Sequence, residues 1–187
     1  MNKKGFTLVE LLGVMVLLSV LMMIAIPGIS NLVKKNKDKV YVQDAKKLIS
    51  LAEYKVKSSQ NKYIKKPKTN ECIILTLGYL NDGTLDTTPN NDEYLKDASY
   101  VMVTNIGSDY QYYVTLIEKY KGVYKGIDNA TLDQLKSRTY ETKVFKDDEV
   151  FYINSAAKAA SGNTSGGVIP NRLGEFKGKK IVGKYND

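Results

Sequence analysis

The sequence of 187 residues contains no histidine and a single cysteine, Cys72. Without histidine, the chain lacks the side chain most often used as a catalytic base or a zinc ligand. One cysteine permits neither an intrachain disulfide nor a thiolate metal cluster. No nucleophile–base arrangement stands out among the remaining residues, so the sequence argues against an enzyme and predicts no cofactor and no metal site.

Charge is scarce at one end of the chain, although the formal net charge is +8. Residues 5–33 hold one charged side chain, Glu10. Residues 34–68 hold twelve lysines against three acidic residues, and residues 69–187 hold fourteen basic against sixteen acidic residues. The length allows one domain with an appendage, so we predict an apolar segment, a basic connector and a nearly neutral soluble domain.

The apolar segment runs from Phe6 to Ile29. A helix of this length spans about 36 Å, which is enough to cross a bilayer core of about 30 Å. The segment is longer than the apolar region of a secretory signal peptide, and Pro27-Gly28-Ile29-Ser30 is not a small-residue cleavage site. We therefore predict a membrane-spanning helix. Lysines flank both ends, so the positive-inside rule leaves its orientation open.

Two residues of this segment do not suit a plain membrane anchor. Glu10 places a charge in the apolar run, at a cost of about 2.5–3.5 kcal/mol near the centre of a bilayer. Pro27 removes the backbone donor to the carbonyl of Met23, and this predicts a bend in the helix. An intramembrane carboxylate is by default a functional residue whose partner has to be found.

The stretch KKGFTLVELL at Lys3–Leu12, with Pro27 downstream, resembles the N-terminus of type IV pilins and pseudopilins. The resemblance implies that residues 1–5 are a leader peptide, that a prepilin peptidase cuts between Gly5 and Phe6, and that Phe6 is then N-methylated. It also implies that Glu10 pairs with the N-terminal amine of a neighbouring subunit. The alternative is that Glu10 reaches the membrane surface from an ordinary anchor.

The resemblance implies a structural role. The chain would be a major or minor pilin, held in the cell membrane by one span before assembly and exposed on the cell surface in a helical pilus afterwards. Its partners would be other pilin subunits, prepilin peptidase and the pilus assembly machinery, in adhesion, twitching motility or biofilm formation. The absence of a disulfide favours a Gram-positive source, and the abundance of Lys, Asn, Ile and Tyr indicates an AT-rich genome.

Residues 30–58 predict an amphipathic basic helix that continues the apolar one. Apolar side chains recur at helical spacing, and lysines occupy the remaining faces. We expect one helix from about Thr7 to about Ser58. Its lysines form either a solvated face or a polybasic strip that contacts a membrane or a neighbouring subunit. The apolar stripe comprises Val33, Val40, Tyr41, Ala45, Leu48, Ile49, Leu51, Ala52 and Val56.

Residues 59–187 form the predicted soluble domain. The resemblance implies the α+β pilin fold, in which the helix packs on an antiparallel sheet and its hydrophobic half protrudes. The pattern predicts a β-hairpin and further short strands, and an inert, buried thiol at Cys72. The expected elements are a helical turn at Glu71–Leu80, hairpin strands at Tyr100–Ile106 and Tyr110–Glu118, a capped helix at Asp128–Lys136, strands at Lys143–Phe145 and Glu149–Asn154, a loop at Ser155–Gly167 and an edge strand at Lys180–Lys184.

Two other hypotheses remain open from the sequence. In the first, a minor pilin binds an anionic polymer such as extracellular DNA, because basic residues gather near the C-terminus with tyrosines nearby for stacking. In the second, the protein is anchored in the membrane and does not polymerise. The candidate polymer-binding residues are Arg172, Lys177, Lys179, Lys180 and Lys184.

Overall fold

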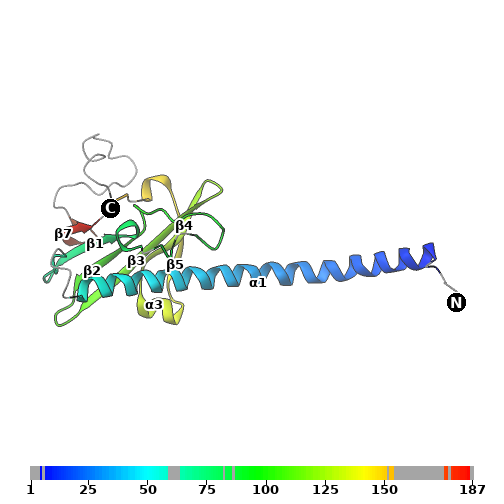
Figure 1. The fold of residues 1–187 in the computed structure, drawn as a ribbon, viewed down its shortest axis with the longest axis horizontal. Coiled ribbons are helices and arrows are strands. Elements are labelled where there is room, and N and C mark those ends of the chain that lie inside the picture. The colour runs from blue at the N-terminus through cyan, green and yellow to red at the C-terminus, as the bar shows by residue number, and fades with distance from the viewer. Residues whose placement is uncertain are drawn as a thin grey trace. The chain divides into compact units, whose positions relative to one another are not determined.

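A computed structural model describes residues 5, 7–58, 64–81, 83–85, 87–150, 152–153, 175–176 and 178–185 (Figure 1). The chain divides into two compact units, residues 1–39 and 40–187. Phe6, Arg172, Lys177 and the expected loop at Ser155–Gly167 lie outside the described residues.

Helix α1 extends from Leu8 to Lys57 and contributes to both units. The helix predicted from Thr7 to Ser58 is therefore confirmed to within a residue at each end. Helical structure continues on both sides of Pro27, whose predicted bend stays a prediction. A helix tolerates an internal proline where the single lost hydrogen bond is its main cost.

Seven described strands form one sheet in the order β5-β4-β3-β2-β1-β7-β6. All neighbours pair antiparallel except β1 and β7, which are parallel. Short helices α2 (Leu77–Leu80) and α3 (Leu132–Ser137) and the 3-10 turn η1 (Asp147–Glu149) lie between strands. The strands are β1 (Glu71–Thr76), β2 (Tyr100–Asn105), β3 (Tyr110–Tyr120), β4 (Val123–Thr131), β5 (Glu141–Phe145), β6 (Glu175–Phe176) and β7 (Lys179–Tyr185).

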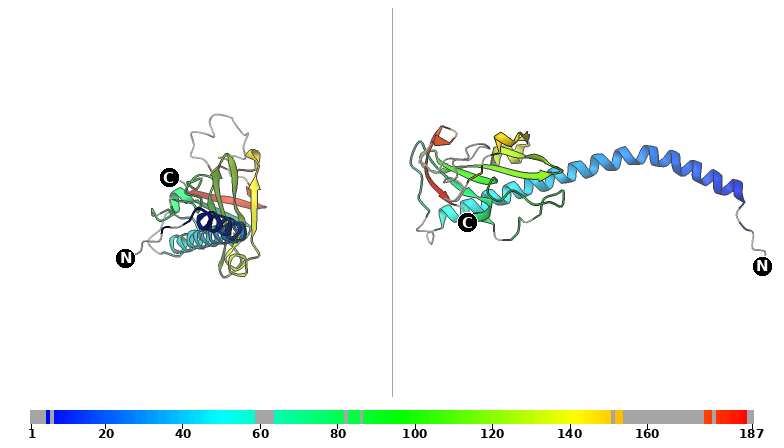
Figure 2. Two further views of the ribbon diagram at one scale, coloured as in Figure 1. Left: turned by 90° about the vertical axis from the view of Figure 1, so that its right-hand side faces the viewer. Right: turned by 90° about the horizontal axis from the view of Figure 1, so that it is seen from above.

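The C-terminal part of α1 packs along one face of the sheet (Figure 2). Its buried residues share a core with Ile73 and Leu75 of β1 and with Val101 and Val103 of β2. This arrangement confirms the α+β pilin fold predicted above. Val33 and Val40 of the expected stripe are exposed instead. The helix residues in the core are Ala45, Leu48, Ile49, Ala52 and Val56.

The β2–β3 hairpin matches the prediction closely. Gly107 in its turn has φ +108°, a conformation that a residue with a side chain rarely adopts. The predicted strand at Lys143–Phe145 is confirmed within β5. The helix expected at Asp128–Lys136 is confirmed only from Leu132, since Asp128 and its neighbours continue β4. The capping box between Thr131 and Gln134 defines this start.

Three expectations about the strands were wrong. Of the helical turn expected at Glu71–Leu80, only Leu77–Leu80 is helical, as α2, and Glu71–Thr76 is a strand. Strand β1 lies between β2 and β7 and is buried on both faces, which hides the alternation typical of a half-buried strand. Glu149 ends the turn η1, and the described residues that follow it form no strand. Finally, the sheet is mixed rather than purely antiparallel, because β7 pairs parallel with β1. The strand expected at Lys180–Lys184 lies within β7, and β6 covers its outer side only at Lys179 and Lys180.

Candidate functional site

The first turn of α1 holds Glu10 by contacts within the chain. The Glu10 carboxylate oxygen Oε2 accepts hydrogen bonds from the backbone N–H and the hydroxyl of Thr7, both at 2.8 Å. The Thr7 hydroxyl in turn accepts from the backbone N–H of Glu10 at 3.3 Å. This reciprocal pair satisfies two amide donors at the helix N-terminus, those of Thr7 and Glu10.

Between Glu10 and Ile29, apolar side chains lie on all sides of the helix. Large side chains from Leu8 to Ile29 are exposed, with Leu8 at 81% and Ile29 at 59%. The helix is long and apolar enough to cross a membrane. Because an amphipathic helix would expose a polar face, a helix that is apolar on all sides needs either lipid or other protein around it. Hydroxyls at Ser19 and Ser30 bond to carbonyls one turn back and so stay satisfied there.

Part of the lysine-rich connector is used inside the protein. Lys55 donates from Nζ to the carbonyl oxygen of Tyr79 at 2.8 Å and lies over its ring. Lys57 pairs with Glu53 at 2.7 Å, an exposed contact of the kind that contributes little to stability. Lys34 and Lys35 are exposed. These contacts do not distinguish a solvated face from a polybasic strip, so both interpretations of the lysines stay predictions.

The structure separates two lysines of the proposed polymer-binding surface, Lys180 and Lys184. Lys180 pairs with Glu71 and Lys184 with Ile74, and the register shifts between these two pairs. Ile181 packs on the face of the sheet away from α1, whereas Val182 packs on the α1 side. Residues four apart in a regular strand share a face, but the bulge adds one residue and places Lys180 and Lys184 on opposite faces. Binding of an anionic polymer there remains a sequence-based prediction.

Cys72 is buried in β1, where its thiol contacts the carbonyl oxygen of Lys179 at 3.8 Å. Burial raises the pKa of this thiol to about 11, although the charge of Lys179 acts in the opposite direction. The predicted inert thiol fits this environment, since the reactive thiolate is disfavoured.

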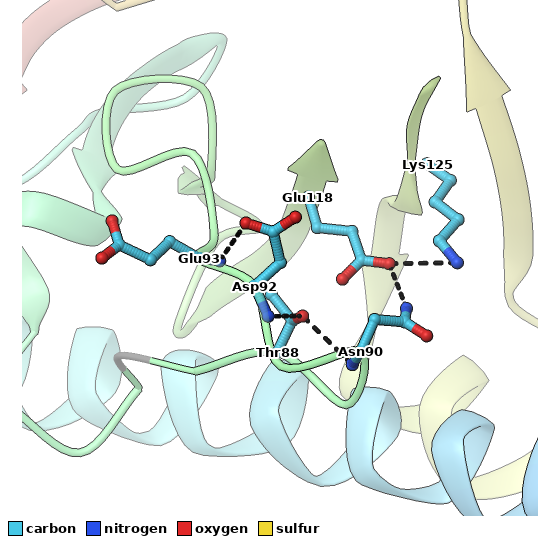
Figure 3. A network of polar contacts seen from close by, with 6 residues as sticks. All are labelled: Thr88, Asn90, Asp92, Glu93, Glu118 and Lys125. Carbon is cyan, nitrogen blue, oxygen red and sulfur yellow. Dashed lines mark hydrogen bonds and ion pairs between the residues drawn. The ribbon is translucent and has the colours of Figure 1, made fainter. Parts of the chain in front are cut away.

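A buried polar cluster around Glu118 of β3 has no counterpart in the sequence-based predictions (Figure 3). The Glu118 side chain is fully buried, and its Oε1 accepts from Nδ2 of Asn90 and lies 3.1 Å from Nζ of Lys125 on β4. Burial raises the pKa of Glu118, but interactions with Thr88, Tyr41, Lys125 and Asn90 outweigh it and hold the pKa below its ordinary value. The carboxylate is therefore stabilised in its charged form.

The turn that supplies Asn90 is itself held by Thr88. The Thr88 hydroxyl accepts from the backbone N–H groups of Asn90 and Asp92, both at 3.2 Å (Figure 3). The Thr88 N–H also donates to the carbonyl of Asp92 at 2.8 Å. The three residues of this cluster come from a turn, which holds Asn90, and from strands β3 and β4. Glu118 and Lys125 are close in the sequence and pair across the β3–β4 hairpin, whereas no local pattern indicates the contact with Asn90.

The comparisons with known proteins point to the N-terminus. Residues 1–26 match the family model of the prokaryotic N-terminal methylation motif. Neither a curated protein nor a solved structure matches the chain. The matched range contains Gly5, Phe6 and Glu10. The chain thus carries the N-terminal signal of a type IV pilin-like prepilin, followed by an apolar helix of membrane-spanning length.

Proposed function

We propose that this protein is a structural subunit of a type IV pilus, cut between Gly5 and Phe6, N-methylated at Phe6 and assembled through α1. The observation that carries the proposal is the apolar helical stretch Leu8–Ile29, whose single charged residue, Glu10, lies within the matched methylation motif. The compact unit of residues 40–187 has its own core, to which the C-terminal part of α1 contributes its buried residues.

The same helical surface suits two environments in turn. In the membrane, lipid covers the apolar side chains, and in a filament the equivalent helices of other subunits cover them. Lipid and packed helices are similarly apolar, so the transfer changes the hydrophobic free energy little. Helix association then depends on close packing and on polar contacts between subunits. In this proposal Glu10 supplies the polar contact that defines the position of one subunit against the next.

Glu10 can act in this way because of where the cut falls. Cleavage before Phe6 creates an amine one residue from Thr7, whose N–H and hydroxyl already bind the Glu10 carboxylate. An ammonium group from a neighbouring subunit would neutralise Glu10 in the apolar filament core. A buried ion pair offsets its desolvation only when its geometry is good, so subunits with a wrong axial offset would be disfavoured.

The proposal is tested by peptide mass spectrometry on filaments sheared from the cell surface, with the membrane fraction analysed in parallel. We expect N-methylated Phe6 at the N-terminus of the chain in the sheared fraction. The abundance of the chain relative to other pilins distinguishes a major from a minor subunit. Detection only in membranes, with residues 1–5 still attached, would refute the proposal in favour of an anchored protein that does not polymerise.

A further inference from the structure

One carboxylate oxygen brings together an amine and a carboxamide from distant parts of the chain. Oε1 of Glu118 lies 3.1 Å from Nζ of Lys125 and accepts a hydrogen bond of 2.5 Å from Nδ2 of Asn90 (Figure 3). Two atoms that contact the same oxygen at these distances lie less than 5.6 Å from each other. The structure therefore brings together a nucleophile, the amine of Lys125, an electrophile, the carboxamide of Asn90, and a proton acceptor, the carboxylate of Glu118.

The backbone positions all three groups. Glu118 and Lys125 are cross-strand partners in β3 and β4, so their side chains emerge side by side. Asn90 sits in the turn that Thr88 closes, and this turn is tied to the sheet by the bridge between Tyr94 and Glu118. The approach of Asn90 to Lys125 thus follows from the fold rather than from the freedom of two surface side chains.

The surroundings of Glu118 limit access of water. Its side chain is fully buried, and Tyr94 in the neighbouring segment is 3% exposed. The ring of Tyr120 lies 4.6 Å from Nζ of Lys125, whose side chain is 35% exposed. The Glu118 carboxylate is the proton acceptor next to the Lys125 ammonium, and a proton that passes between them leaves two neutral groups. This transfer would produce the free amine that nucleophilic attack requires.

We propose that Lys125 and Asn90 are joined by an intramolecular isopeptide bond, and that Glu118 moves the protons in its formation. Glu118 takes one proton from the Lys125 ammonium, and the neutral Nζ attacks Cγ of Asn90. The carboxylic acid of Glu118 stays beside Nδ2 of Asn90, the atom that it contacts in the structure and that becomes the leaving group.

Collapse of the tetrahedral intermediate breaks the bond between Cγ and Nδ2. The second proton of Nζ passes to the departing nitrogen, which leaves as ammonia, and Glu118 releases its own proton to that ammonia. An ammonium side chain and a carboxamide become one secondary amide and one ammonium ion. No oxidant, metal or other co-reactant takes part.

Such a bond would clamp the segment between α2 and β2 to the β3–β4 hairpin. A covalent link between residues 90 and 125 closes a long loop of the chain, which restricts the unfolded state and raises the unfolding temperature. The link would also prevent this segment from detaching under tension. A filament subunit that bears tension gains from this, but the bond does not depend on assembly.

Intact-mass spectrometry of the purified full-length protein tests the proposal. We expect the wild-type protein to be lighter by one ammonia molecule than the mass calculated from its own N-terminus. Trypsin should fail to cut after Lys125, and fragmentation should show a branched peptide that contains Asn90. The variants Lys125→Arg and Glu118→Gln should have the full calculated mass and a lower unfolding temperature, whereas Lys119→Arg, with an exposed lysine on β3, should keep the mass deficit.

A folded wild-type protein with its full calculated mass would overturn the proposal. So would a mass deficit that persists in Lys125→Arg, because the ammonia would then come from another residue. If Glu118→Gln does not fold, Lys125→Arg still decides the outcome, since it retains the positive charge and leaves Glu118 paired. None of these results depends on whether filaments form, so a failed pilus assignment and a failed cross-link are distinguishable.

Discussion

The hydroxyl of Tyr94 donates a hydrogen bond to a carboxylate oxygen of Asp44 over 2.7 Å, and so connects the segment before β2 to helix α1. The Tyr94 ring also meets the ring of Tyr41 edge to face, with centroids 5.9 Å apart. Burial raises the pKa of Asp44, and the bond from Tyr94 partly opposes this. Tyr94 therefore supplies both packing and the hydrogen bond that makes a half-buried carboxylate tolerable.

Replacing Tyr94 by Phe should lower the free energy of unfolding by about 1–3 kcal/mol, because the Asp44 carboxylate loses a hydrogen bond while it stays partly buried. Denaturant titration measures the change. The control is Tyr54→Phe, at an exposed position on helix α1, which should change the free energy of unfolding by less than about 0.5 kcal/mol. Equal effects of the two variants would contradict the assigned role of the hydrogen bond.

Changing Glu10 to Gln should reduce incorporation into filaments by more than tenfold, since removal of one partner from a buried ion pair costs about 3–5 kcal/mol. Membrane insertion should be unaffected, because the apolar run becomes even less polar. Immunoblots of sheared and membrane fractions measure both quantities. Asp38→Asn, at an exposed acidic position on the same helix, is the matched control. Normal assembly of the Glu10→Gln variant would rule out the pairing role.

Gly126 of β4 has no space for a side chain. A Cβ atom at this position would lie 1.8 Å from the backbone carbonyl oxygen of Leu116, so β3 and β4 would have to separate. We expect Gly126→Ala to lower the free energy of unfolding by about 3 kcal/mol, at the upper end for overpacked cores. Thermal unfolding followed by near-UV circular dichroism measures this loss. An unchanged unfolding temperature, matching that of the control Thr142→Ala on the exposed side of β5, would argue against the close strand contact.

Stability should fall as the pH rises above 9, in part because of Cys72. Its pKa is about 11 in the folded protein against 9.0 without burial, so between these values the unfolded chain has already released a proton that the folded one keeps. The unfolded state then binds fewer protons, and the free energy of unfolding decreases with pH by up to about 3 kcal/mol. Denaturant titrations of wild type and Cys72→Ala at pH 8 and pH 10 measure the effect. The variant should lose less stability than wild type, and parallel losses would exclude a contribution from the thiol.

The local sequence alone determined the features that depend on interactions between residues close together in the chain. A long apolar run with Glu10 and a leader ending in Gly5 requires no knowledge of the fold, and the motif match agrees with it. The helical spacing of Ala45, Leu48 and Ala52 also predicts the buried stripe of α1, because a helix repeats its own geometry regardless of its neighbours.

Only the tertiary structure decided where distant segments meet. The apolar sequence at Cys72–Leu75 is compatible with a buried helix or a buried strand, and its place between β2 and β7 made it a strand. The bulge that separates Lys180 from Lys184 arises from pairing with β1. No sequence motif marks Asn90, Glu118 or Lys125. The reaction proposed for them depends on the contacts that both Asn90 and Lys125 make with Glu118 in the folded protein. Proximity between a turn and two strands is a property of the packed chain, since no local pattern encodes the distance between residues so far apart.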